Sequence, residues 1–223
     1  MKNYLAFILS AFLFFFGNPA IAFENLETKN SVGKPMPIHR YGDGKVAVLL
    51  AYQYKGKIND WQFFAKELAM KGYTAYTFDF NGYGSNPGYK KDRTKNHLDV
   101  IEAAKFVRSK GAEKLYLIGS SMGAGAVLKA AETLQTDGVV ALAPFVDRNK
   151  GYANPSAKSA RLITEKLLLV STQNDSSAPY AKKLKKLIPS STLVMYSGKA
   201  HGMKILKTDN GENLKAKIFQ FLQ

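Results

Sequence analysis

The stretch Lys114-Leu-Tyr-Leu-Ile-Gly-Ser-Ser-Met-Gly-Ala-Gly125 decides the fold, because an apolar, strand-like run turns there directly into a run of small residues. It contains the pattern G-x-S-x-G, which places Ser121 at the tip of the turn. A serine on such a strand-to-helix turn is strained, and the flanking glycines are needed where a Cβ would clash. The turn also points the first free N–H groups of the helix at whatever the hydroxyl contacts. The stretch therefore predicts a nucleophilic Ser121.

The surroundings of the pattern distinguish it from a chance match, because a glycine-rich chain often contains G-x-S-x-G as an ordinary turn. Residues 115–118 are short and apolar, as a parallel strand buried on both faces should be. Residues 122–134 are mostly small or apolar, which is typical of a helix packed inside a fold. The pattern thus has the strand–turn–helix context that a nucleophile turn requires.

A serine hydroxyl is a weak nucleophile until a neighbouring imidazole removes its proton. The chain has three histidines. His39 precedes the first expected core strand and His97 lies at a polar helix start, so both are interpreted as surface residues. His201 lies in a glycine-flanked loop after the apolar run 193–196. It is the only histidine after Ser121 and is the candidate base, although a loop histidine is often structural.

Asp175 is the candidate acid that would orient this imidazole. It follows the apolar run 167–171 in a polar loop. A structural alternative is that Asp175 only caps the next helix, whose start is marked by Ser177 and Pro179. Asp147, after the preceding strand, is the reserve candidate. The chain order serine, aspartate, histidine, each after a different strand, is that of one known triad architecture.

Strand-like and helix-like segments alternate along the rest of the chain. The expected strands are 46–50, 73–78, 115–118, 138–143, 167–171 and 193–196, and the expected helices are 61–71, 95–110, 122–134, 178–188 and 212–222. This alternation predicts an α/β fold with a mostly parallel sheet and helices on both faces. Residues 23–37 are predicted to be an extended lead-in with little of their own to bury.

These motifs together resemble the α/β-hydrolase superfamily, and the resemblance covers almost the whole chain after residue 45. Residues 78–85, F-D-F-N-G-Y-G-S, are similar to the D-x-R-G-x-G turn of many members, with Asn81 in place of the arginine. In the family this turn braces the site, so no catalytic role is assigned to it. The resemblance implies an α/β-hydrolase fold and a serine hydrolase with the three residues above as its catalytic triad.

The expected oxyanion hole departs from the family pattern. Members often have His-Gly after the strand that supplies the second N–H donor, whereas here residues 46–50 run into Ala51-Tyr-Gln-Tyr-Lys-Gly56. Any residue except proline supplies a main-chain N–H, so the hole can survive this change. By position, the main-chain N–H groups of Gln53 and Met122 are expected to form it, with Tyr52 as the next possibility.

The segment that follows the expected strand 138–143 is too short for a lid. Family members usually insert a substrate-covering cap there, and fewer than twenty residues separate Phe145 from Leu162. We therefore expect a minimal cap and an open site. Tyr52, Tyr54 and Tyr152 are the expected substrate-binding side chains of a shallow pocket, which favours small or protruding acyl groups.

The amino terminus has the layout of a secretory signal peptide, with Lys2, an apolar core and the small-residue ending Ala20-Ile-Ala22. We predict cleavage after Ala22, a single domain over residues 23–223, and a secreted or periplasmic protein. The apolar core falls short of the roughly 20 residues that span a bilayer, so no transmembrane span is expected in the mature chain. An uncleaved anchor is the alternative.

The net charge of +15 becomes +14 without the leader, because Lys2 is the only charged residue before position 23. Such a charge attracts anionic partners, including anionic surfaces or polymers. The basic residues are scattered and no nucleic-acid motif accompanies them, so specific nucleic-acid binding is not expected. The chain has no cysteine, which excludes thiol nucleophiles, disulfides and cysteine-type zinc sites. We expect no cofactor and no metal.

Two hypotheses of different classes follow. The first is a secreted or periplasmic hydrolase that cleaves carboxylic esters or thioesters of small-molecule substrates through an acyl-enzyme on Ser121. The second is a catalytically silent binding or assembly protein that keeps the fold, which the missing His-Gly leaves open. A peptidase is a weaker third hypothesis, because the sequence has no accessory domain that would select peptides. The fold alone does not decide among them.

Overall fold

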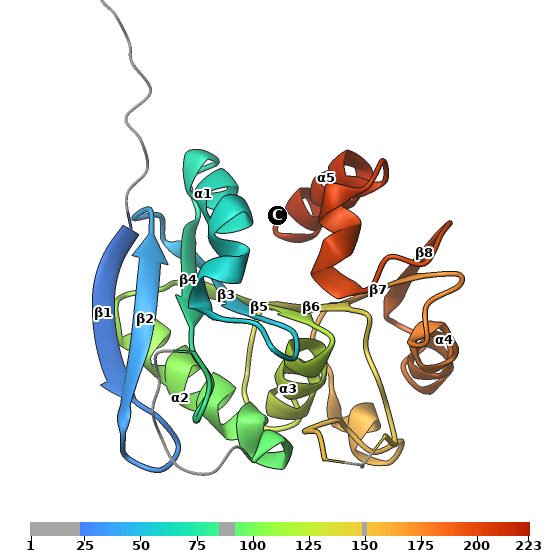
Figure 1. The fold of residues 1–223 in the computed structure, drawn as a ribbon, viewed down its shortest axis with the longest axis horizontal. Helices are drawn as coiled ribbons and strands as arrows, with labels where there is room; N and C mark the ends of the chain where they lie inside the picture. The colour runs from blue at the N-terminus through green and yellow to red at the C-terminus, as the bar shows by residue number, and fades with distance from the viewer. Residues whose placement is uncertain (1–22, 85–91, 149–150) are drawn as a thin grey trace, which may run out of the picture.

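The computed structural model describes residues 23–84, 92–148 and 151–223, so the predicted signal peptide lies outside the described residues. The described chain forms an eight-stranded sheet in the order β1-β2-β4-β3-β5-β6-β7-β8 (Figure 1). Its strands are β1 (Phe23–Lys29), β2 (Pro35–Tyr41), β3 (Val46–Ala51), β4 (Thr74–Phe78), β5 (Lys114–Ser120), β6 (Gly138–Leu142), β7 (Leu167–Thr172) and β8 (Thr192–Tyr196).

Helices cover both faces of this sheet. In Figure 1, α1 and α5 lie on one face and α2 and α3 on the other, and α4 packs beside β7 and β8. The helices are α1 (Gln62–Met70), α2 (Asn96–Ser109), α3 (Met122–Ala130), α4 (Ala178–Leu187) and α5 (Gly211–Phe221), with short 3₁₀ turns η1 (Ile58–Trp61), η2 (Arg93–Lys95), η3 (Ser159–Leu162) and η4 (Gly202–Lys207). The predicted α/β fold with helices on both faces of a mostly parallel sheet is confirmed.

The core lies in the parallel part of the sheet, where β3, β4, β5, β6, β7 and β8 run in one direction. Every residue of β4, β6 and β7 is buried. Burial on both faces explains why these strands are mostly apolar and do not alternate between apolar and polar residues. Each buried Val, Leu or Ile contributes about 1.5–3 kcal/mol relative to exposure. This core fixes the strand ends from which the site loops start.

The hairpin β1–β2 is an element that the sequence analysis missed. Its strands pair antiparallel with each other, and β2 also pairs antiparallel with β4. Most of residues 23–37 are extended, as predicted, but Met36 is fully buried and Phe23 and Leu26 pack against the core, so the prediction that this segment buries little was wrong. β1 is a largely exposed edge strand, and β2 contains two prolines, which are typical of sheet edges but obscure a strand pattern.

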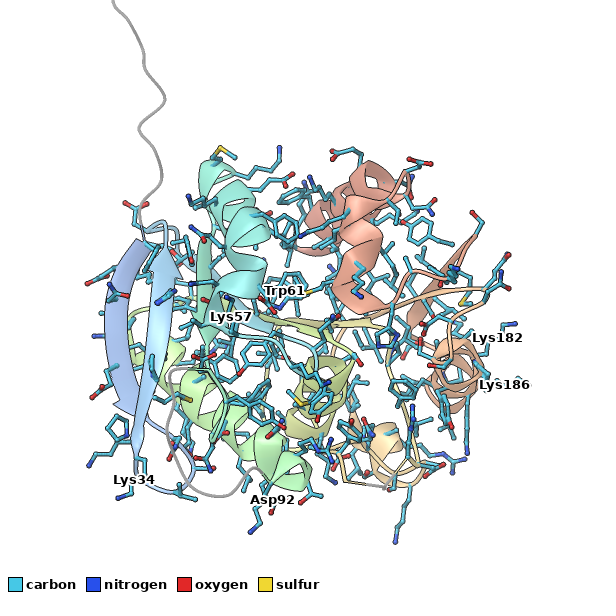
Figure 2. All side chains as sticks on the ribbon, in the orientation of Figure 1. Lys34, Lys57, Trp61, Asp92, Lys182 and Lys186 are labelled. Carbon is cyan, nitrogen blue, oxygen red and sulfur yellow. The ribbon has the colours of Figure 1, made fainter. Side chains whose placement is uncertain are left out.

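The positive charge is spread around the molecule. Figure 2 shows Lys34 near the end of the β1–β2 hairpin, and Lys182 and Lys186 projecting outward from α4 on the other side. Within α4, Lys183 is paired with Asp147, with its Nζ 2.7 Å from the carboxylate. Among the described residues, no helix is long and apolar enough to cross a bilayer. Attraction of an anionic surface or polymer stays a prediction.

Candidate active site

The turn between β5 and α3 is as strained as the G-x-S-x-G pattern predicts. Ser121 has φ 52° and ψ −106°, a left-handed conformation that is costly for a residue with a Cβ. Its main-chain N–H donates to the Leu142 carbonyl at 2.8 Å. A Cβ at Gly119 would overlap the carbonyl of Gly123, and a Cβ at Gly123 would overlap the carbonyl of Ala51. The glycines therefore allow a turn that holds the serine away from the strand.

The structure brings the three predicted triad residues together. His201 Nε2 lies 2.7 Å from Ser121 Oγ, and His201 Nδ1 lies 2.7 Å from Asp175 Oδ2. The His201 side chain is 31 % exposed and that of Asp175 only 7 %, so the serine–histidine end of this hydrogen-bond chain is the end open to solvent. The other two histidines lie elsewhere. His39 stacks on Phe23 in the hairpin and His97 lies on α2, and both are partly buried rather than solvated.

Asp175 is held as a carboxylate. Burial alone would raise the pKa of this carboxyl, but hydrogen bonds from Ser177 and His201 outweigh it and lower the pKa below its ordinary value. One of them is the Ser177 main-chain N–H, 2.8 Å from Asp175 Oδ1. Asp175 thus binds the chain just before α4 as well as the imidazole. An ionised acceptor at Nδ1 favours the tautomer in which Nδ1 carries the proton and Nε2 accepts from the serine hydroxyl.

Asp147, the reserve acid, is occupied elsewhere. Its Oδ1 accepts the Ala157 main-chain N–H at 2.6 Å, and its Oδ2 lies 2.7 Å from Lys183 Nζ. Both contacts lower the pKa of its carboxyl. The residue has φ 57° and closes the loop after β6. The geometry therefore favours Asp175 as the partner of His201.

The expected oxyanion donors lie on two backbone segments in direct contact. A Cβ at Gly123, next to Met122, would overlap the carbonyl of Ala51 and also approach that of Tyr52, the residue before Gln53. Within the described part of the chain, neither the Met122 nor the Gln53 main-chain N–H donates to a protein acceptor. Two adjacent free donors beside the nucleophile are what a developing oxyanion requires. Their catalytic use stays a prediction.

Ser120, which the sequence analysis did not single out, joins this segment to the histidine loop. Its fully buried hydroxyl accepts the Met203 main-chain N–H at 2.8 Å and donates to Gln53 Oε1 at 3.2 Å. A Cβ at Gly202 would overlap the same oxygen. One buried hydroxyl therefore sets the distance between the Gln53 turn and the loop that begins at His201. The motif marks position 120 only as a variable residue, so this role has no local signal.

A cavity of about 140 Å³ lies beside the nucleophile. Its lining residues are Tyr54, Ser121, Met122, Phe145, Arg148, Tyr152, Asn154, Ser176 and His201. Tyr54 and Tyr152 are among them, and their role in substrate binding stays a prediction. The others come mainly from the loops after β6 and β7, whose approach depends on the tertiary fold. A larger, open hollow of about 670 Å³ lies between α1 and η4, and its lining includes neither Ser121 nor His201.

The prediction that Tyr52 lines the pocket was wrong. Its side chain is fully buried, its hydroxyl accepts the Phe80 main-chain N–H at 3.0 Å, and its ring packs edge-on against Phe80. Burial, followed by the charge of Asp79, raises the pKa of this phenol. Tyr52 lies directly after β3 and points into the core, whereas Tyr54, two residues on, is 43 % exposed.

The turn after β4 braces the structure. Asp79 is fully buried and accepts the Ile58 main-chain N–H at 2.8 Å. A Cβ at Gly84 would overlap its carboxylate. Asn81, which stands where the family pattern has arginine, accepts a hydrogen bond from Asn30 in the β1–β2 turn. These contacts tie the hairpin and η1 to the sheet.

Several solved structures share this fold. An esterase of Pyrococcus furiosus superposes with a TM-score of 0.77 at 16 % identity, covering 91 % of this chain and 92 % of its own. A lidless α/β serine hydrolase of Xanthomonas campestris gives 0.71 at 20 % identity, with 90 % and 93 % covered. A predicted CIB-like hydrolase of Thermoplasma acidophilum gives 0.70 at 22 % identity, with 91 % and 98 % covered. At these identities the likeness shows the fold.

Residues 44–203 match the family described as serine aminopeptidase, S33, and this match covers more than half of the chain. The matched range contains Ser121, Asp175 and His201. The eight-stranded sheet, the strained turn at Ser121 and this match agree with one another. The chain belongs to the S33 family of the α/β-hydrolase superfamily.

Proposed function

We propose that this protein is a secreted or periplasmic serine hydrolase that cleaves carboxylic esters or thioesters through an acyl-enzyme on Ser121. The observation that carries the proposal is the continuous hydrogen-bond chain from Ser121 Oγ through His201 to Asp175, at 2.7 Å in each step. The positive φ of Ser121 is conformationally costly, and the need to present its hydroxyl to a substrate explains this strain.

In the first half-reaction His201 Nε2 takes the hydroxyl proton while Ser121 Oγ attacks the carbonyl carbon. The carbonyl oxygen becomes an oxyanion, which the N–H groups of Met122 and Gln53 would bind. Asp175 stabilises the imidazolium that forms. When the intermediate collapses, the bond to the alcohol or thiol breaks, and His201 gives its proton to the leaving group. Water then repeats the sequence on the acyl-enzyme, releasing the acid and free Ser121.

The size of the cavity favours short acyl groups. Sites for drug-sized ligands usually measure 300–1,000 Å³, whereas this one measures about 140 Å³. The described residues between β6 and β7 contain one short 3₁₀ turn, η3, and no longer helix. A site without a multi-helix lid gives a long hydrophobic chain little apolar cover, so we propose small esters as substrates.

An aminopeptidase is the second candidate, because the matched family carries that description. Such an enzyme must bind the free ammonium group of its substrate, which requires a nearby acidic or other accepting group. The cavity beside Ser121 is instead lined by Arg148, and no carboxylate is among its described lining residues. This electrostatic environment disfavours a cationic substrate and supports the ester proposal.

A fluorophosphonate probe on the purified protein tests the proposed chemistry, because it labels only an activated serine. We expect one label, on Ser121, and turnover of ethyl butyrate that exceeds that of long-chain esters and of aminoacyl anilides. Ser121→Ala is the matched control and should lose both signals. Silence of the folded wild-type protein toward the probe and toward esters would favour the binding-protein hypothesis.

A separate experiment tests the proposed export. The protein is expressed with its leader in a host that has a secretion system, and the amino terminus of the mature protein is sequenced; we expect Phe23 as its first residue.

A further inference from the structure

Two arginines flank the cavity, and each is held by aromatic rings. Arg148 lines the cavity directly, with its guanidinium carbon 4.6 Å from the ring centre of Phe145. That ring lies 6.3 Å from the ring of His201. Stacking orients a guanidinium while leaving the N–H groups at its edge free to donate. Arg148 is therefore a positioned donor close to the catalytic imidazole.

Arg93 is fixed at the other side of the tyrosine pair. Its guanidinium carbon lies 5.0 Å from the ring centre of Tyr54 and 4.5 Å from that of Tyr152. Its Nη1 also donates to the Tyr152 hydroxyl at 3.1 Å. Both tyrosines line the cavity, so the positive charge of Arg93 lies just behind its wall.

Neither arginine is neutralised within the described ranges. Neither forms an ion pair there with a carboxylate, in contrast to Arg40 and Arg108, which pair with Glu24 and Asp137. The carboxylate of the candidate triad, Asp175, is hydrogen-bonded to His201 and Ser177. Among the described residues, the lining of this small cavity includes Arg148 and no carboxylate, and Arg93 adds a second cation behind the tyrosines. We therefore expect a positive potential there, which attracts an anionic group.

We propose that the acyl group cleaved by this enzyme carries a carboxylate, which the guanidinium edge of Arg148 binds. The substrate class is the half-ester or half-thioester of a short dicarboxylic acid. Arg148 and Ser121 line the same small cavity, so we place the anion on the acyl group, which is the part of the substrate that stays attached to Ser121 after the leaving group departs. Arg93 adds a second positive charge behind the tyrosines. This specificity rests on the proposed function and adds a substrate class to it.

The kinetic test compares two esters with acyl chains of the same length, monoethyl succinate and ethyl butyrate. We expect kcat/KM for the half-ester to exceed that for the neutral ester in the wild-type protein. Arg148→Gln should lower this ratio by about tenfold or more, because a charge-assisted contact is lost. Arg148→Lys keeps the charge without the planar fork and should fall between them. Arg161→Gln removes an exposed arginine outside the cavity lining and should leave the ratio unchanged.

A binding test separates this proposal from the proposed function. Monomethyl succinate is titrated into Ser121→Ala and into the double variant with Arg148→Gln, and the shift of NMR signals gives the affinity. Weaker binding by about tenfold in the double variant supports the anion site even if neither ester is turned over. Ser121-dependent cleavage of ethyl butyrate with the same ester ratio and the same affinity in the Arg148→Gln proteins would overturn the anion site and leave the hydrolase intact.

Discussion

The turns after β5 and β3 lie side by side, because they follow the carboxyl ends of two neighbouring parallel strands. They depend on the amino-acid sequence in different ways. The turn after β5 presents the Ser121 side chain at a positive φ, which requires glycines at fixed positions. The turn after β3 offers the Gln53 main-chain N–H, and the side chain of its neighbour Tyr52 is buried. A catalytic side chain can be recognised from a sequence motif, whereas a main-chain N–H donor can come from any residue except proline. If this difference also holds in function, substitutions should cost more activity in the β5 turn than in the β3 turn.

The largest effect is expected in the β5 turn and its base. Ser121→Ala and His201→Ala should each lower kcat for ethyl butyrate by a factor on the order of 10⁶, and the double variant should add little, because both act on the same proton transfer. Steady-state kinetics of the three variants measures this. Additive losses in the double variant would mean that the two residues work in separate steps, and the 2.7 Å contact would not be catalytic.

The next effect distinguishes the two candidate acids. Asp175→Asn should lower kcat by about 10⁴, because the amide favours the wrong imidazole tautomer. Asp147→Asn is the matched control: its carboxylate binds Ala157 and Lys183, so it should change kcat by less than about tenfold. The reverse order of the two variants would contradict the assignment of Asp175.

The elements that can be predicted from the sequence are those that short, local stretches of residues determine. The parallel strands are continuous apolar runs, and each was located to within a few residues. The candidate triad could be placed because each member follows such a strand. The hairpin was missed because β1 is polar, and because the prolines in β2 hide the short alternation of Met36 and Ile38, which Tyr41 does not continue. Tyr52 was misplaced because the direction of a side chain just after a strand depends on how the chain leaves the sheet.

The residues that only tertiary contacts bring to the site could not be predicted from the sequence. Arg148 and Phe145 lie on the loop after β6, and Arg93 belongs to η2, more than fifty residues earlier. Only the fold places the tyrosines between them. Ser120 is a similar case, because its partners Gln53 and Met203 are far from it in sequence.

A smaller effect is expected for the bond between the two turns. Ser120→Ala leaves the buried Met203 N–H and Gln53 Oε1 without their partner, which costs about 1–3 kcal/mol of stability. It should also lower kcat, by less than the 10²–10³ that loss of an oxyanion donor typically costs. Ser191→Ala removes another buried hydroxyl, which donates to the Ile188 carbonyl at 2.7 Å and contacts no site residue, and is the control for stability alone. Equal kcat values in the two variants would show that Ser120 positions neither the Gln53 turn nor the His201 loop for catalysis.

The smallest effect concerns the pH dependence of stability. The pKa of Asp175 is lowered in the folded protein, because hydrogen bonds from Ser177 and His201 overcome the effect of burial. A lowered pKa means that the carboxylate stabilises the fold above the pKa of the unfolded chain, about 3.9, and that this stabilisation is lost as pH falls through the folded-state value. The difference in unfolding free energy between wild type and Asp175→Asn should therefore be widest above about pH 5 and should narrow toward pH 3. Urea unfolding of both proteins across this range measures it, and the other acids cancel because both chains contain them. A difference that stays constant from pH 6 to pH 3 would show that the carboxylate of Asp175 contributes no net charge stabilisation, and that its role is confined to orienting the imidazole for the serine of the neighbouring turn.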